Sequence, residues 1–308
     1  MMINMNRILN DDRLVRAVTG LSIIGFNELS CKFANALQNI KQEQYNESIS
    51  IGKRKRGLGG GSKGRLRTIQ LKLLFILMYF KCYPTMDLMG LFFDLNRSNV
   101  KHNVDNLTPV LEKALDKLLS LPKRKISTLK EFLEIIPEAK DLFIDGTERP
   151  IQRAKDQKKQ KENYSGKKKA HTKKNIVISD EKNRIGYLCP TKPGKEHDYS
   201  LFKGEFDPKT IPKDISLWMD KGFYGIKNDY PEATVVMPKK KPRGKELTDY
   251  EKEQNKVISG IRILSEHAIG GIKRLRIVTD KFRNKNDEFN DKVMNLACGL
   301  WNYQLGYC

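Results

Sequence analysis

The spacing of apolar and polar residues divides the chain into a helical first part and a mixed second part. Residues 68–80 are almost continuously apolar and long enough for a buried helix. A second helix is predicted over Thr85–Phe93, because threonine is a good N-cap residue. Ser98 can cap a third helix, and the pair Thr108-Pro109 predicts the start of a fourth, since proline suits the first helical position.

The third predicted helix is polar and basic and follows a tight turn. This order is typical of a helix-turn-helix, whose last helix enters the major groove of DNA. Asn99, Lys101 and Asn103 are the residues of this helix that are expected to contact bases and phosphates. A small helical bundle without DNA-binding function has the same pattern, and this alternative stays open. Residues 121–138 are interpreted as a connector with one more helix.

From residue 141 onward the apolar runs become short and rich in β-branched residues. Such runs predict strands. They lie at residues 142–145, 175–180, 184–189, 215–220 and 233–238, with a hairpin turn between the second and the third. A long helix is predicted over residues 251–278. Strands followed by a long helix indicate a mixed α/β domain.

The long helix has one apolar face and one charged face. Apolar residues recur at steps of three and four positions and predict a buried stripe made of Val257, Ile261, Leu264, Ala268, Ile272 and Leu275. Arg262, Glu266 and Lys273 share the opposite face. A solvated helix face looks similar, but here a carboxylate lies between two cations that could also hold phosphates.

Two predicted strands end in the same way, with an aspartate followed by a glycine turn. Asp145 lies in "FIDGT" and Asp220 lies in "WMDKG". Ligands of open α/β sheets bind beyond the carboxyl ends of strands, although Asp-Gly is also a common turn dipeptide. Together with Glu266, these acids suit a site for Mg²⁺, which prefers oxygen ligands. Two such ions can catalyse an in-line phosphoryl displacement.

The charge of the chain indicates a polyanionic partner. Lys and Arg number 58 against 37 Asp and Glu, a formal net charge of +21. Residues 151–174 hold ten basic and two acidic residues, and residues 53–67 hold seven basic residues and no acid. Such clusters favour nucleic acid. The glycine-rich stretch 53–67 fits either a DNA contact or a flexible linker.

Several classes of protein are disfavoured by what the sequence lacks. No apolar run of about 18 residues is present, which argues against a membrane span. The charged start of the chain does not resemble a secretory signal. Five scattered cysteines without a CxxC pair favour reduced thiols in a cytoplasm and argue against a zinc knuckle. The absence of GxxxxGK[ST] argues against nucleotide hydrolysis.

Six motifs together resemble the DDE transposases of bacterial insertion sequences, in the branch related to PIF/Harbinger elements. The motifs are "FIDGTERPIQR", "YSGKKKAHTKKN", "PGKEHDYSLF", "DKGFYG", "PKKKPRGKELT" and "IRILSEHAIGGIKRLRI". The resemblance covers about residues 68–303. It implies a ribonuclease H-like, mixed-sheet α/β catalytic domain over residues 139–308. An all-α helix-turn-helix domain would precede it at residues 68–135, after a helical segment and basic linker at residues 1–67.

The resemblance also implies the catalytic residues. Asp145, Asp220 and Glu266 would be the catalytic acids and would bind two Mg²⁺ or Mn²⁺ ions. Asp198 is the rival for the second acid and ranks as auxiliary, because it follows a loop rather than a strand. Arg262 and Lys273 match the family signature around the glutamate, whereas Ser259 stands where that signature has tyrosine.

The implied activity is cleavage at the terminal inverted repeats of a mobile element and joining of the 3′-hydroxyl ends to target DNA. The partner would be double-stranded DNA, bound by a homodimer or higher oligomer in the bacterial cytoplasm, at the nucleoid, without a membrane. The expected DNA-binding residues are Asn99, Lys101, Asn103, Lys167, Lys168, Lys169 and Lys173. A silent or domesticated DNA-binding protein and a metal-dependent nuclease without strand transfer remain as alternatives.

Overall fold

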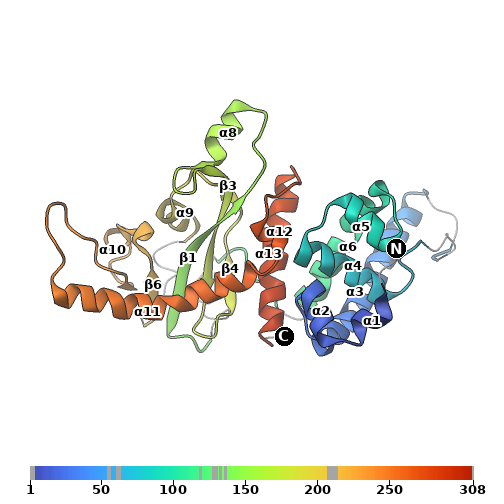
Figure 1. Ribbon diagram of the computed structural model, residues 1–308, viewed down its shortest axis with the longest axis horizontal. Coiled ribbons are helices and arrows are strands. Elements are labelled where there is room, and N and C mark those ends of the chain that lie inside the picture. The colour runs from blue at the N-terminus through green and yellow to red at the C-terminus, as the bar shows by residue number, and fades with distance from the viewer. Residues whose placement is uncertain are drawn as a thin grey trace. The chain divides into compact units, whose positions relative to one another are not determined.

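The structure is a computed structural model that describes residues 4–53, 57–59, 64–117, 120–126, 131, 134, 137–206 and 214–306. The chain forms two compact units. Unit 1 contains residues 1–120, 274–277 and 306–308, and unit 2 contains residues 121–273 and 278–305. In the described residues unit 1 is helical, whereas unit 2 combines a sheet with helices (Figure 1).

Unit 1 is a bundle built around one apolar helix. Its helices are α1 (Met5–Leu9), α2 (Asp12–Thr19), α3 (Ile23–Ser50), α4 (Ile69–Cys82), α5 (Met86–Phe93) and α6 (Arg97–Lys117). Every residue of α4 from Leu73 to Phe80 is buried, which confirms the predicted buried helix. The side chains of Thr68 and Thr85 accept hydrogen bonds from backbone N–H groups at the starts of α4 and α5, so the predicted cap at Thr85 is also confirmed.

The prediction of a fourth helix after Thr108-Pro109 is wrong. Helix α6 continues through Pro109 up to Lys117. Buried apolar residues lie at helical spacing on both sides of the proline, among them Val104, Leu107, Leu111 and Leu115. Packing of this continuous stripe outweighs the loss of one backbone hydrogen bond at the proline.

The start of α6 differs from its prediction by two residues. The Asn96 side chain, not Ser98, caps the helix, because its Oδ1 accepts from the Asn99 N–H at 2.8 Å. The helix predicted within residues 121–138 lies partly outside the described residues; Glu131 and Glu134 are helical. In the basic stretch 53–67, residues 54–56 and 60–63 also lie outside the described residues.

Unit 2 contains a mixed sheet. Its strands are β1 (Asp141–Pro150), β2 (Tyr164–Ser165), β3 (Ala170–Ser179), β4 (Ile185–Leu188), β5 (Lys192–Pro193), β6 (Ser216–Met219) and β7 (Thr234–Val236). The order among the described strands is β2-β3-β1-β6-β7, and β4 and β5 also pair with β3. Strand β3 runs antiparallel to β1, whereas β6 is parallel to β1 and β7 is parallel to β6.

Strand β1 does not end at Asp145, so the predicted Gly-Thr turn is wrong. Residues 146–150 continue the strand and pair with residues 172–176 of β3. Polar residues in this extension are buried, including Thr147 and Arg149. The Arg149 guanidinium donates to the backbone oxygen of Asn290 at 3.0 Å and to Asn175 Oδ1 at 2.9 Å. These distant partners stabilise a strand segment that lacks an apolar pattern.

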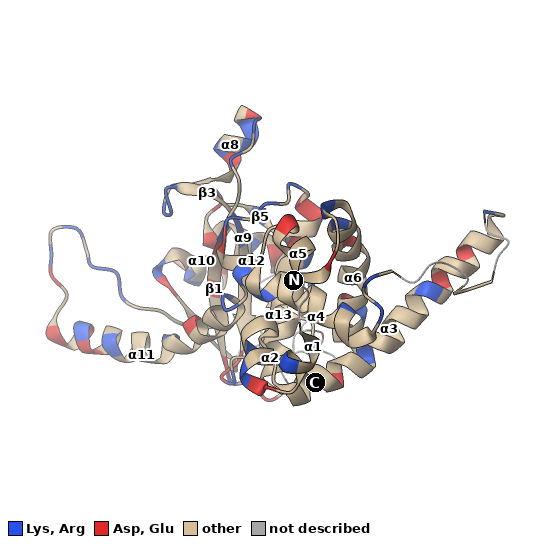
Figure 2. Ribbon diagram, turned by 45° about the vertical axis from the view of Figure 1, so that its right-hand side comes forward, with Lys and Arg blue, Asp and Glu red and all other residues tan. Residues whose placement is uncertain are grey.

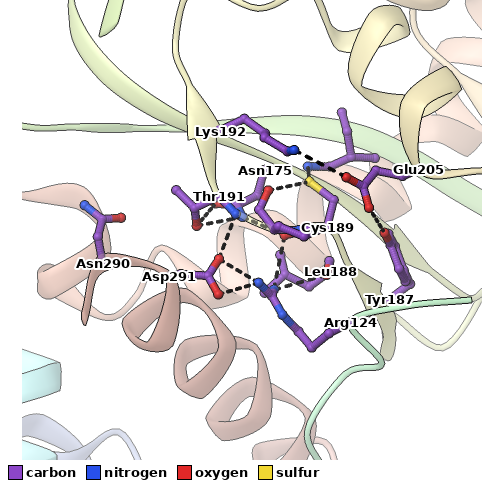
Figure 3. Close-up of polar contacts among 12 residues, drawn as sticks. Arg124, Asn175, Tyr187, Leu188, Cys189, Thr191, Lys192, Glu205, Asn290 and Asp291 are labelled. Carbon is purple, nitrogen blue, oxygen red and sulfur yellow. Dashed lines mark hydrogen bonds and ion pairs between the residues drawn. The ribbon is translucent and has the colours of Figure 1, made fainter. Parts of the chain in front are cut away.

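Helices cover the sheet of unit 2 and project beyond it. They are α8 (Gln157–Asn163), α9 (Asp198–Glu205), the short 3₁₀ helix η2 (Lys221–Phe223), α10 (Ile226–Asp229), α11 (Asp249–Ile272) and α13 (Asp287–Gln304). The short helix α12 (Arg276–Thr279) is divided between the two units. Helix α13 is tied to the sheet by a polar network (Figure 3). In it, Asp291 accepts from the Thr191 N–H at 2.7 Å and pairs with Arg124 at 2.5 Å.

The predicted apolar stripe of α11 is buried only toward the end of the helix. Ala268 and Ile272 are buried, as predicted, but Val257 is 56% exposed and Ile261 is 38% exposed. Only the second half of α11 packs against β1 and α13; the first half extends past the strands (Figure 1). The apolar stripe of α11 therefore extends beyond the part of the helix that packs against β1 and α13.

Close packing of α11 on α13 depends on Gly271. A Cβ atom at this position would lie 2.3 Å from the ring of Trp301. The ring cannot easily move, because its Nε1 donates to the Asn183 carbonyl at 2.9 Å. This contact fixes the position of α11, and hence of its charged residues, on the sheet.

We predict that Gly271→Ala lowers the free energy of unfolding by about 1–3 kcal/mol, the usual cost of overpacking a core. Gly270→Ala is the matched control, since a Cβ there meets nothing within 4 Å. It should be neutral or stabilise by about 0.5–1 kcal/mol, because alanine favours a helix interior. Urea unfolding of both variants measures the difference, and equal effects would contradict this account of the packing.

Candidate active site

Asp145 in β1 and Asp220 directly after β6 lie side by side, because the two strands are parallel neighbours. Ile144 of β1 pairs with Met219 of β6, and each aspartate is the next residue of its chain segment. Neighbouring strands are about 4.8 Å apart. The two acids that the sequence placed at strand ends are thus brought together, although Asp145 lies within a longer strand.

Asp198, the first residue of α9, lies against both of these positions. A Cβ atom added to Gly146 would be 2.6 Å from Asp198 Oδ1, and one added to Gly222 would be 3.1 Å from Asp198 Oδ2. The carboxylate therefore occupies the space that side chains would fill beside Asp145 and Asp220. Only glycine at position 146 permits this close approach.

Backbone N–H groups hold two of the carboxylates. Asp145 Oδ1 accepts from the Gly146 N–H at 2.7 Å, and Asp220 Oδ1 accepts from the Gly222 N–H at 2.6 Å. One carboxylate oxygen of each aspartate is thus held by a backbone N–H group one or two residues further along the chain. Their second oxygens have no hydrogen bond to any described residue.

The proximity of the three acids changes the pKa of Asp145. Burial, the neighbouring charge of Asp220 and, to a smaller extent, the charge of Asp198 raise this pKa to about 6. The Gly146 N–H and the Arg262 guanidinium oppose the rise. Burial and the like charges therefore outweigh the groups that favour the ionised form of Asp145.

Three cations surround the acids. Lys174 Nζ lies 3.0 Å from Asp198 Oδ1 and 3.5 Å from Glu148 Oε1. Arg262 and Lys273 of the α11 region act on Asp145 through their charge. Burial lowers the pKa of Lys273, as does the nearby Lys168. Cations beside carboxylates can hold both the acids and the phosphates of a substrate.

Glu266 is not brought into contact with the aspartates. It is exposed, and no hydrogen bond or ion pair joins it to a described residue. It lies on α11 between Arg262 and Lys273, whose charges both act on Asp145. This part of α11 therefore passes the acid site, with the Glu266 side chain in solvent.

Sequence reasoning missed Glu148 and Lys174. They are opposite residues in the antiparallel pairing of β1 and β3. Their side chains are 6% and 7% exposed, respectively. The available signal was alternation along the strand, because Glu148 lies two residues after Gly146 and so shares its face. The Asp-Gly pair hides this alternation, because it predicts a turn directly after Asp145.

The described side chains at this site are of the type that binds divalent cations, although they are not arranged as a closed metal site. Within the described part of the chain, no group of three His, Cys, Asp or Glu side chains is arranged closely enough to hold a metal. The donors are nevertheless carboxylate oxygens, which Mg²⁺ and Mn²⁺ prefer. Asp198 Oδ1 is buried without a hydrogen bond, because its contact with Lys174 has the distance of an ion pair but not the geometry of a hydrogen bond.

The expected DNA-binding residues lie in both units. Lys167, Lys168 and Lys169 are exposed in the loop between β2 and β3, next to the basic helix α8 (Figure 2). Lys173 is partly buried and pairs with Asp287 at 2.9 Å. In unit 1 the α6 residues Asn99 and Lys101 are exposed and Asn103 is partly exposed. None of the described helices is long and apolar enough to span a membrane.

The raised pKa of Asp145 predicts a stability that depends on pH. Between about pH 4 and 6 the folded protein keeps a proton on Asp145 that the unfolded chain has lost, so stability falls as pH rises through this window. In EDTA, Asp145→Asn should raise the free energy of unfolding at pH 8 by about 1–3 kcal/mol and change little at pH 4. Asp116→Asn, at an exposed position of α6, should show no such difference.

Urea unfolding at both pH values is the measurement. A destabilised Asp145→Asn protein at pH 8, or an equal effect at pH 4 and pH 8, would contradict the rise in the pKa of Asp145 by burial and neighbouring charge.

Comparisons with known proteins identify the family. The model of the family described as DDE superfamily endonuclease matches residues 144–302, and the helix-turn-helix of DDE superfamily endonuclease matches residues 64–117. A probable transposase for insertion sequence element IS702 from Microchaete diplosiphon is 29% identical over 281 residues, 90% of this chain and 96% of that protein. No solved structure matches. The chain therefore belongs to the DDE superfamily endonucleases, as a transposase of an insertion element with a helix-turn-helix ahead of its catalytic residues.

Proposed function

We propose that the protein cleaves DNA at the terminal inverted repeats of its element and joins the 3′-hydroxyl ends to target DNA. The observation that carries this proposal is the convergence of Asp145, Asp198 and Asp220, from β1, α9 and the end of β6, in a basic protein. Hydrolysis and strand transfer are both phosphoryl displacements, in which positioning and charge stabilisation supply the catalysis.

Asp145, Asp220 and Glu266 are the proposed catalytic acids and metal ligands, with Asp198 as an auxiliary acid. Two Mg²⁺ or Mn²⁺ ions, when bound, activate the attacking oxygen and stabilise the leaving oxygen. The chain itself fixes Asp145 and Asp220 through the N–H groups of Gly146 and Gly222. Glu266, exposed and without a partner in the described chain, is free to turn toward bound ions.

A ribonuclease H-like fold is proposed for residues 139–308. The mixed sheet supports it, as do the acids on β1 and after β6 and the helix α11 that passes them. The proposed domain boundaries ahead of it are residues 1–67 and 68–135. The proposed location is the bacterial cytoplasm at the nucleoid, where the DNA substrate lies.

Double-stranded DNA is the proposed partner of two surfaces. The exposed polar residues of α6 would bind the element ends through the helix-turn-helix. The basic segment 151–174 would bind phosphates near the acids, and Arg262 and Lys273 would bind phosphates at the acids themselves. A homodimer or higher oligomer on DNA is proposed, because two ends must be joined to one target.

We predict that Asp220→Asn and Glu266→Gln abolish strand cleavage and joining. Both changes keep the shape of the side chain but remove the negative charge that binds divalent ions. Each should therefore lower the rate of cleavage and joining by more than the roughly 100-fold expected for residues that only orient a metal ligand. DNA binding should persist, because removal of negative charge cannot weaken attraction to phosphate. Labelled element ends with Mg²⁺ provide the cleavage and joining assay.

Asp198→Asn should lower the rate of cleavage and joining less than these two changes, because Asp198 is proposed as an auxiliary acid. Near-normal joining by Glu266→Gln would overturn the assignment of that residue. Cleavage without joining by the unaltered protein would favour a metal-dependent nuclease instead, and binding without either reaction would favour a silent DNA-binding protein.

We predict that Lys101→Ala weakens binding to element ends and lowers the salt dependence by about one phosphate contact. Lys101 is exposed and its ion pair with Asp105, at 2.6 Å, lies within α6 and can open to a phosphate. Lys32→Ala, at an exposed position of α3 outside the matched helix-turn-helix, is the control and should leave the salt slope unchanged. Fluorescence anisotropy across a range of salt concentrations is the measurement. An unchanged slope for Lys101→Ala would remove this residue from the interface.

A further inference from the structure

Lys174 is a lysine buried among the acids. Its side chain is 7% exposed, and it lies on β3 opposite Glu148 of β1. Nζ is 3.5 Å from Glu148 Oε1 and 3.0 Å from Asp198 Oδ1. Lysine is rarely buried unless it is paired. Here it is paired with two carboxylates from different elements.

The two carboxylates are held differently. Glu148 is also bonded by the Thr172 hydroxyl, which donates to Oε2 at 2.8 Å. Lys174 is the partner of Asp198 among the described ion pairs, and Asp198 Oδ1 has no hydrogen bond. The opposite charges of Glu148 and Lys174 cancel, so the Asp198 carboxylate gives this group of three side chains a net negative charge.

Lys174 holds both the side chain of Asp198 and the backbone that leads to it. Nζ donates a hydrogen bond to the Glu196 carbonyl at 2.7 Å, two residues before α9 begins. His197, the residue between them, gives α9 no side-chain cap. The start of α9 is therefore fixed to β3 by one ammonium group.

Repulsion would otherwise move Asp198 away. Its carboxylate lies against Gly146 and Gly222, beside the like charges of Asp145 and Asp220. A carboxylate beside like charges is held in place by a nearby cation, which here is the Lys174 ammonium at 3.0 Å.

We propose that Lys174 is a positioning residue that holds Asp198 beside Asp145 and Asp220 before any metal binds, so that Asp198 is available as a further oxygen donor. This inference rests on the proposed metal-dependent function. In this proposal Lys174 acts only through Asp198 and binds neither metal nor DNA itself.

The test compares Mn²⁺ binding by the full-length protein and by Lys174→Met, without DNA, using electron paramagnetic resonance of free Mn²⁺. Loss of a positive charge alone would strengthen cation binding. We expect weaker binding by about 10–100-fold instead, the usual effect of losing a residue that orients a metal ligand. The rate of cleavage should fall over the same range, with unchanged affinity for element ends.

A double-mutant cycle shows whether Lys174 acts through Asp198. If it does, Lys174→Met combined with Asp198→Asn should bind Mn²⁺ no more weakly than the worse single variant. Lys192→Met is the matched control, because Lys192 is opposite Lys174 on β5 but pairs with Glu205 at 3.7 Å, outside the acid site. It should bind Mn²⁺ like the unaltered protein.

Should Lys174→Met fail to fold, Glu148→Gln/Lys174→Met removes one charge of each sign and leaves Asp198 without its cation. Unchanged or tighter Mn²⁺ binding by the folded variant, or additive effects in the cycle, overturns the inference while the proposed function stands. An unaltered protein that neither binds Mn²⁺ nor cleaves DNA overturns the proposed function, and this inference with it.

Discussion

Repulsion among closely spaced carboxylates is the constraint on which the arrangement of the active site depends. Asp145 and Asp220 follow a parallel strand pair, and Asp198 lies where two glycines leave room. Burial, together with the charges of Asp220 and Asp198, raises the pKa of Asp145 to about 6. Backbone pairing imposes this proximity, because neither strand can move without breaking the sheet. The free energy of folding thus holds charges together that would separate in a flexible chain.

Cations are the necessary counterpart of these acids. Lys174 pairs with Asp198, and the charges of Arg262 and Lys273 act on Asp145. The basic segment 151–174 directly follows β1, which carries Asp145, and ends within β3 at Lys174. Phosphate cannot approach bare carboxylates without positive charge between them. An acid site within a basic surface is therefore what a DNA-cleaving site requires, whether the positive charge comes from side chains or ions.

Local pattern sufficed for part of the fold and of the site. Apolar runs and capping threonines predicted α4 and α5, and a strand followed by an acid predicted Asp145 and Asp220. The rest depends on partners far away in the chain. Strand β1 continues because Arg149 finds acceptors on α13 and β3, and Asp198 meets Lys174 across 23 intervening residues. The sequence around each residue carries no signal of such contacts.

Glu266 stays exposed and outside the group of aspartates. Burial, Asp220 and Asp198 already raise the pKa of Asp145, and a further carboxylate beside them would add to the repulsion. In solvent, Glu266 keeps its hydration and costs nothing. Divalent ions reverse this balance, because carboxylates then attract through the metal instead of repelling one another. A glutamate on a helix that passes the site can respond to that change by rotation of its own side chain. Asp145 is fixed within the paired strand β1, and Asp220 directly follows β6 with one oxygen held by the Gly222 N–H. In the proposed mechanism these two acids are therefore in place before the ions bind, whereas Glu266 turns toward them afterwards.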